Sequence, residues 1–219
     1  MSAHLHRYPE TPDDTFVAQV ERAQLCDLLD QVGPHAPTRC SGWDTHHLAA
    51  HLVVREGSPL GVVRLLRQSA ADAEVERTVA ERDFDSLVED LRTGPPRASV
   101  FGTALTNRRG NGLEFYIHHE DVRRGRPGFD QRELPAWAQR ELWSGVVFMG
   151  WHLLRKSPVG VGLRRSDNGE LRVVAKKPRA VVVAGLPSEI ALFVYGRADV
   201  AKVALEGAPD DVAALRAAS

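Results

Sequence analysis

The sequence contains few of the residues that mark several classes of protein. Its 219 residues include only two cysteines, Cys26 and Cys40, which are too few for a disulfide framework and are expected to be free thiols. No apolar run reaches the roughly 20 residues that span a bilayer, and the first residues lack the apolar segment of a signal peptide. We therefore expect a cytoplasmic protein with no membrane partner.

The chain also lacks an excess of charge of either sign. It has 28 basic and 29 acidic residues, which leaves a net charge of −1. Proteins that bind nucleic acid usually present a strongly basic surface, so we expect no nucleic-acid partner. Lysine is scarce, because only four of the 28 basic residues are lysine. This bias is typical of a GC-rich genome. The expected partners are small molecules, and the chain is expected to be a monomer or a homodimer.

Hydrophobic periodicity predicts helices in the first part of the chain. The predicted helices cover residues 16–32, 45–69, 84–91, 112–124 and 135–156. Pro59 lies inside the second of them and predicts a kink or a break near residue 58. The first 156 residues are therefore expected to form a bundle of four or five helices.

The pattern changes after Pro158. Short runs rich in β-branched residues predict strands at 159–164, 171–175 and 180–184, and Asp167-Asn168-Gly169 is a strong hairpin signal. A short helix from Pro187, a strand at 199–207 and a helix at 210–218 complete the chain. The predicted fold class is α+β, with a helical domain at 1–156 and a small α+β domain at 157–219.

Histidine is unusually clustered. Five of the nine histidines lie on two predicted helices. His47 and His51 are four residues apart and share a helix face, as do Glu114 and His118. One His from the first helix with the Glu and His of the second gives three ligands with open positions, as in catalytic zinc sites. Spacing alone leaves open both the choice of metal and the alternative that these are solvated surface residues.

Two segments resemble a known family. CSGWDTHHLAAHLVVRE resembles the W-x-x-x-x-L-A-A-H-L signature of the DinB-like, mycothiol-dependent maleylpyruvate isomerase superfamily, in which this His is a metal ligand. The resemblance implies that His51 is a ligand. LEFYIHHEDVRRG is similar to the family's later helix and supplies Glu114 and His118 as the other ligands. The Cys before the Trp and the Arg-Glu after His-Leu resemble an actinobacterial subgroup described mainly as metal-binding proteins.

The C-terminal part carries a third resemblance. PRAVVVAGLPSEIALFVYGRADV is similar to the small sterol-carrier-protein-like domain that often follows the DinB-like four-helix bundle. The resemblance implies a divalent-metal-dependent enzyme, with zinc as the expected metal. Such an enzyme activates a low-molecular-weight thiol such as mycothiol for transfer or isomerisation on an electrophilic, possibly anionic, small molecule. It also implies that Arg197 reaches the active site and binds the substrate; the alternative is a surface arginine that ends a helix.

Four further residues carry open alternatives. Arg55 follows His51 by one helical turn and is a candidate for binding the cosubstrate, or is structural. His47 stands where the family usually has Asp, and is either a fourth ligand or a partner of a ligand. Cys40 is a soft ligand, a reactive thiol or structural. Asp121 is expected to pair with nearby arginines or to bond a ligand. A non-catalytic metal-binding protein and a metal-assisted hydrolase remain alternative functions.

Overall fold

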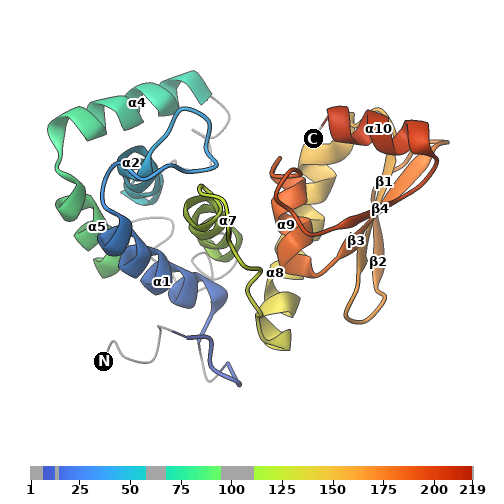
Figure 1. Ribbon diagram of the computed structural model, residues 1–219, viewed down its shortest axis with the longest axis horizontal. Helices are drawn as coiled ribbons and strands as arrows, with labels where there is room; N and C mark the ends of the chain where they lie inside the picture. Colours follow the sequence, from blue (N-terminus) through green and yellow to red (C-terminus); the bar gives the residue numbers. More distant parts are fainter. Residues whose placement is uncertain (1–6, 13–14, 58–67, 95–110, 219) are drawn as a thin grey trace. The chain divides into compact units, whose positions relative to one another are not determined.

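The computed structural model describes residues 7–12, 15–57, 68–94 and 111–218 (Figure 1). These residues form helices and one four-stranded sheet, so the expected α+β class is confirmed. The chain divides into two compact units, residues 1–130 and 131–219.

The first unit is helical. Its described α-helices are α1 (Val17–Val32), α2 (Thr45–Gly57), α4 (Gln68–Glu81), α5 (Phe84–Thr93) and α7 (Gly112–Arg123). Helices α1, α2, α5 and α7 pack around one core, because each contributes apolar residues at helical spacing. The buried members of this core include Leu25, Leu29, Leu48, Leu52, Leu87, Leu91 and Phe115.

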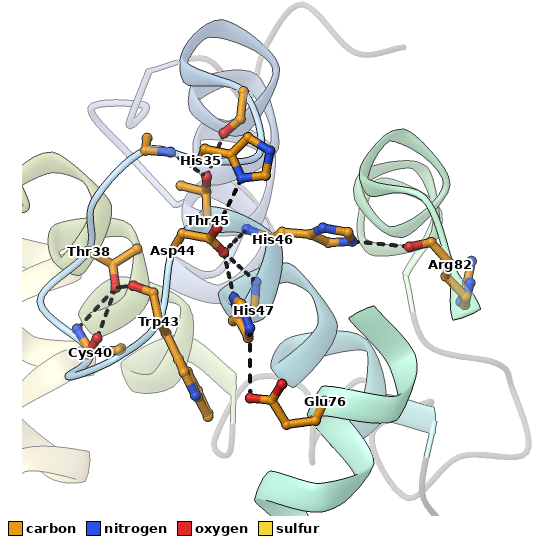
Figure 2. Close-up of polar contacts among 12 residues, drawn as sticks. His35, Thr38, Cys40, Trp43, Asp44, Thr45, His46, His47, Glu76 and Arg82 are labelled. Carbon is orange, nitrogen blue, oxygen red and sulfur yellow. Dashed lines mark hydrogen bonds and ion pairs between the residues drawn. The ribbon is translucent and has the colours of Figure 1, made fainter. Parts of the chain in front are cut away.

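Two aspartates begin helices of this unit. Asp44 accepts hydrogen bonds from the backbone N–H groups of His46 and His47, both at 3.1 Å, and so caps α2 (Figure 2). Asp83 caps α5 in the same way through the N–H of Ser86, at 2.9 Å. The cap at Asp44 fixes the start of the helix that carries His51.

The second helix is described from Thr45 to Gly57. The predicted continuation beyond Gly57 and the kink expected at Pro59 lie outside the described residues. Helix α4 was not predicted at all. Its sequence is rich in alanine and glutamate, which favour helix, but it offers few large apolar residues from which to detect a period.

The second unit combines helices with the sheet. It contains α8 (Ala136–Leu153), η3 (Leu154–Lys156), α9 (Pro187–Val194) and α10 (Pro209–Ala217). The strands are β1 (Gly160–Arg165), β2 (Leu171–Ala175), β3 (Ala180–Gly185) and β4 (Ala204–Glu206). Their order is β2-β1-β3-β4, with β1 parallel to β3 and the other pairs antiparallel.

The core of this unit lies between the sheet and α8 and α9 (Figure 1). Leu163 and Val183 are fully buried in the sheet, and Ile190 is fully buried on α9. The β1–β2 hairpin turns at Gly169, whose φ of +76° favours glycine. The predicted hairpin and the first three strands are therefore confirmed within one residue at each end.

The boundary between the units differs from the expected one at residue 156. The structure divides at Asp130, and α8 belongs to the second unit because it packs against α9 and β2. Gly150 of α8 permits this packing, since a Cβ there would lie 3.1 Å from Leu163 and 3.3 Å from Val174. Among the described residues, no helix is long and apolar enough to cross a membrane.

Candidate metal centre

Helices α2 and α7 bring three potential metal ligands together. The Nε2 atom of His51 lies 3.5 Å from Oε1 of Glu114, and Nε2 of His118 lies 3.3 Å from the same oxygen. The three ligand atoms lie within 4.8 Å of one another, and the two imidazole rings meet edge to face at 5.1 Å. The structure thus brings together the three residues that the spacing and the resemblance single out.

This donor set fits a divalent transition metal. Ligands at metal distances of about 2.0–2.2 Å in tetrahedral geometry stand about 3.3–3.6 Å apart, which the His–Glu distances already match. Two imidazoles and one carboxylate leave a fourth position open for water or substrate, as catalytic zinc sites do. His51, Glu114 and His118 would hold the cation.

Arg55 sets the charge of Glu114. Burial opposes ionisation of this carboxyl, but the Arg55 guanidinium and the hydrogen bonds from His118 and His51 outweigh it. They hold the pKa of Glu114 well below its usual range. The Nε atom of Arg55 lies 3.4 Å from Oε1 of Glu114. Glu114 is therefore ionised at neutral pH.

Asp121 orients His118. Its Oδ2 lies 3.0 Å from Nδ1 of His118, and because a carboxylate can only accept, Nδ1 carries the hydrogen. This bond leaves Nε2 to face Glu114 and His51. Burial opposes the charged imidazole, but bonds to Asp121, Cys40 and Glu114 outweigh it and raise the pKa of His118 well above its usual value.

The pKa of His51 shifts in the opposite direction from that of His118. Burial lowers its pKa, and the hydrogen bond to Glu114 only partly offsets that effect. A neutral imidazole offers a nitrogen lone pair to a cation. The ring of Trp43 lies 5.1 Å from that of His51 and restricts its position.

A chain of buried polar contacts connects the centre to the rest of the first unit. Arg55 donates to Oδ1 of Asn111 at 2.6 Å, and Asn111 donates to Oε1 of Glu56 at 2.8 Å. Glu56 in turn pairs with Arg22, whose NH1 also donates to the carbonyl of Leu91 at 2.9 Å. Arg55 is thereby fixed beside Glu114 rather than extended toward solvent.

Cys40 lies beside His118 but on the other side of its ring. Its Sγ is 3.7 Å from Nδ1 of His118, and its thiol donates to Oδ2 of Asp121 at 3.1 Å. Cys40, His118 and Asp121 form a second group of three potential ligands. The structure therefore places Cys40 in a group of potential ligands. A soft ligand, a reactive thiol and a structural residue all stay open as roles for it.

His47 does not point to these ligands. Its Nδ1 lies 2.6 Å from Oδ1 of Asp44, and its Nε2 lies 3.7 Å from Oε1 of Glu76 on α4 (Figure 2). His46 points to α5 instead, where its ring packs edge to face on Phe84. Neither of the two ligand groups in the described part of the chain includes His47.

Two arginines near the predicted motifs occupy different environments. The Nε of Arg124 donates to Glu120 at 2.5 Å within the core, so its ion pair is buried rather than on the surface. Arg197 belongs to the second unit. It follows α9, is half-buried, and donates from NH1 to the carbonyl of Tyr195 at 2.5 Å. This contact fits the alternative that Arg197 ends a helix.

The role of Asn111 was not predicted from the sequence. Asn111 precedes α7, where an asparagine suggests a helix cap, but its side chain makes no capping bond and instead joins Arg55 to Glu56. Glu56 is adjacent to Arg55 in sequence, yet its partner Arg22 is 34 residues away. No local pattern marks such contacts, because they depend on how α1, α2 and α7 pack.

No protein-family model matches the sequence, and no curated protein matches it. The fold is similar to the crystal structure of the mycothiol-dependent maleylpyruvate isomerase, with a TM-score of 0.61 and 16% identity over 92% of this chain and 95% of that one. A second structure, of a mutant of that enzyme with a histidine replaced by alanine, gives the same values. The chain therefore has the same fold as the crystal structure of the mycothiol-dependent maleylpyruvate isomerase.

Proposed function

We propose that this protein is a divalent-metal-dependent enzyme that uses a low-molecular-weight thiol of the mycothiol type. The thiol adds to an electrophilic small molecule in a transfer or isomerisation reaction. The observation that carries the proposal is the convergence of His51, Glu114 and His118 on one point between α2 and α7. The fold shared with an enzyme described as mycothiol-dependent supports the choice of thiol.

The proposed chemistry follows from the donor set. A divalent cation at this position, with zinc as the expected metal, acts as a Lewis acid that favours the thiolate over the thiol. The thiolate is the nucleophilic form. The chain contains only two cysteines, so the reacting thiol arrives as a cosubstrate rather than as a side chain.

The remaining residues prepare the site. Asp121 holds the hydrogen on Nδ1 of His118, so that Nε2 faces the proposed cation. Arg55 keeps Glu114 ionised. The guanidinium is already bonded to Asn111 at 2.6 Å. We therefore assign Arg55 mainly to holding Glu114 in place, with cosubstrate binding as its second proposed role.

We assign the proposed substrate contact to Arg197. Its guanidinium suits a carboxylate, and an anionic electrophile would pair with it. Replacement of Arg197 by alanine should raise the KM for an anionic substrate and spare metal content. We also propose that the first unit corresponds to the DinB-like bundle and the second to the sterol-carrier-protein-like domain.

The experiment measures metal content and turnover together. The protein is purified without added metal, reloaded with zinc, and assayed with a panel of thiols and electrophiles. His51→Ala and Glu114→Gln should each lose zinc and thiol-dependent turnover. His47→Ala is the matched control, since His47 lies one turn away on α2 but faces Asp44 and Glu76.

Each outcome has a distinct meaning. Zinc retained by both His51→Ala and Glu114→Gln would refute the metal centre. One zinc per chain without turnover on any thiol and electrophile would refute the enzyme and indicate a metal-binding protein. Turnover that needs zinc but no thiol would indicate a metal-assisted hydrolase.

A further inference from the structure

The loop that precedes α2 presents a second group of ligand atoms. Cys40 Sγ, Asp121 Oδ2 and His118 Nδ1 lie 3.0–3.7 Å from one another: 3.1 Å for S–O, 3.7 Å for S–N and 3.0 Å for N–O. Metal–ligand distances of about 2.0–2.3 Å require tetrahedral ligands to stand about 3.3–3.8 Å apart. The three atoms therefore need to move by only tenths of an ångström to share one cation.

The charges and the donor types point to a particular class of cation. A thiolate and a carboxylate carry two negative charges between them, which balance a divalent ion. Thiolate is a soft ligand, and soft ligands favour zinc, cadmium and copper(I) over magnesium or calcium. The group on the other side of His118 offers no sulfur, because its ligands are His51, Glu114 and His118.

The loop holds Cys40 in place before any cation binds. The hydroxyl of Thr38 accepts from the N–H of Cys40 at 3.1 Å and donates to the carbonyl of Trp43 at 2.7 Å (Figure 2). The N–H of Arg39 donates to the carbonyl of Asp121 at 3.0 Å, which fixes the loop directly to α7. Such preorganisation reduces the entropy that a bound ion would otherwise cost.

The three residues of this second group differ in their exposure to solvent. The carboxylate of Asp121 is fully buried, and the side chain of His118 is 9% exposed. Cys40 is only partly buried, so it is the most exposed of the three residues. The buried pair behind it supplies the remaining coordination.

The two groups share one imidazole. Nε2 of His118 faces Glu114, and Nδ1 faces Asp121 and Cys40. A neutral imidazole has a single free lone pair, on one nitrogen or the other. When a cation is bound to Nδ1, Nε2 therefore has no lone pair left for a cation in the His51–Glu114–His118 group.

We propose that Cys40, Asp121 and Nδ1 of His118 form a second site for a thiophilic divalent cation, and that its occupation excludes a cation from the His51–Glu114–His118 centre. The cation replaces the hydrogen on Cys40 Sγ and the hydrogen on His118 Nδ1, and both leave as protons. The site is independent of thiol-transfer activity. A protein that fails with every thiol and electrophile can still hold it.

Cadmium tests the site, because a thiolate bound to cadmium absorbs in the ultraviolet and a His/Glu site does not. Titration of the metal-free full chain with cadmium chloride should produce this absorption and saturate at one ion per chain. Cys40→Ser should abolish the absorption, whereas Cys26→Ser, in the core, should retain it. His51→Ala should also retain it, since His51 belongs only to the other group.

A second measurement needs no variant. Cadmium should slow alkylation of Cys40 by iodoacetamide in the wild-type chain, as measured by mass spectrometry, and magnesium should not. Absence of the absorption in the wild-type protein, or its persistence in Cys40→Ser, would overturn the site. Two cadmium ions per chain would overturn the mutual exclusion.

Discussion

At the scale of single residues, His118 is the side chain that the two groups of potential ligands share. Its Nδ1 faces Asp121 and Cys40, and its Nε2 faces Glu114. These bonds outweigh the effect of burial and raise the pKa of its imidazole well above the usual value. In the metal-free protein a proton therefore occupies the position that the proposed cation needs.

This competition predicts a pH dependence of zinc affinity. Below the raised pKa of His118, zinc must displace one proton, so the apparent affinity should rise about tenfold for each pH unit between the ordinary histidine pKa and the raised one. Asp121→Asn removes the charge that favours protonated His118 and should flatten this slope. It should also weaken zinc binding about 10- to 100-fold. Competition titrations with a chelator at several pH values measure both effects.

An affinity independent of pH over that range would contradict the charge assigned to His118. Glu76→Gln is a suitable control, because Glu76 is exposed and faces His47 rather than the ligands. It should leave both the slope and the affinity unchanged.

The three candidate ligands can be picked out from the sequence, whereas the contacts that surround them cannot. Glu114 and His118 lie four residues apart on one helix, and His51 lies in a recognisable motif, so local spacing and resemblance single them out as candidates. Asn111 bonds Arg55 across 56 residues, and Cys40 meets Asp121 across 81. Contacts at such separations depend on the packing of helices, which no short pattern records.

At the scale of elements, a buried ion pair joins the helices of the first unit. Arg22 on α1 pairs with Glu56 on α2 and donates to the carbonyl of Leu91 on α5. Asn111, directly before α7, bonds the same carboxylate at 2.8 Å. Glu56 therefore belongs to a buried polar network that reaches α1, α2, α5 and the start of α7.

Removal of that glutamate's charge should destabilise the unit. Glu56→Gln leaves the guanidinium of Arg22 buried without a counter-charge, and breaking such a pair costs about 3–5 kcal/mol. Chemical denaturation followed by helical circular dichroism measures the loss. A loss below about 1 kcal/mol, the range of exposed pairs, would show that this pair is not needed for packing.

The loop that precedes α2 carries Cys40, and its contact with the end of α7 depends on a glycine. A Cβ at Gly125, just beyond α7, would overlap the carbonyl oxygen of Pro37 and lie 3.1 Å from the Cα of Thr38. Because these are backbone atoms, they cannot move aside as a flexible side chain could. The close approach places Cys40 near Asp121.

Gly125→Ala should therefore destabilise the protein by about 1–3 kcal/mol, as overpacking does. It should also weaken the cadmium–thiolate absorption, since the loop must shift. Gly57→Ala is the matched control, because a Cβ at Gly57 meets nothing within 4 Å and alanine favours helix. Equal thermal midpoints for the two variants would contradict the proposed tight packing.

The elements themselves were largely predictable, with one instructive exception. Strands β1, β2 and β3 have β-branched residues and clear turns between them, so the sequence pattern located them closely. Helix α4 was missed because Val75 and Val79 are its only large aliphatic residues. Helix α8 was recognised as a helix, but the unit it belongs to depends on its packing against α9 and β2.

At the scale of the whole molecule, the proposed metal ligands and the proposed substrate arginine belong to different units. His51, Glu114 and His118 lie in residues 1–130, whereas Arg197 lies in residues 131–219. Each unit has its own buried core. Metal binding alone should therefore affect the first unit, whereas an effect on the second unit should require the substrate.

Hydrogen exchange of the full chain, measured by mass spectrometry, tests this separation. Zinc alone should slow exchange in α2 and α7, because a bound ligand stabilises the elements that hold it, and should leave β1–β4 unchanged. An anionic substrate added with the thiol should then slow exchange around Arg197, and should not do so in Arg197→Ala. Slower hydrogen exchange in β1–β4 with zinc alone would show that the second unit takes part in the metal centre. Unchanged exchange near Arg197 with substrate would show that Arg197 does not bind the substrate.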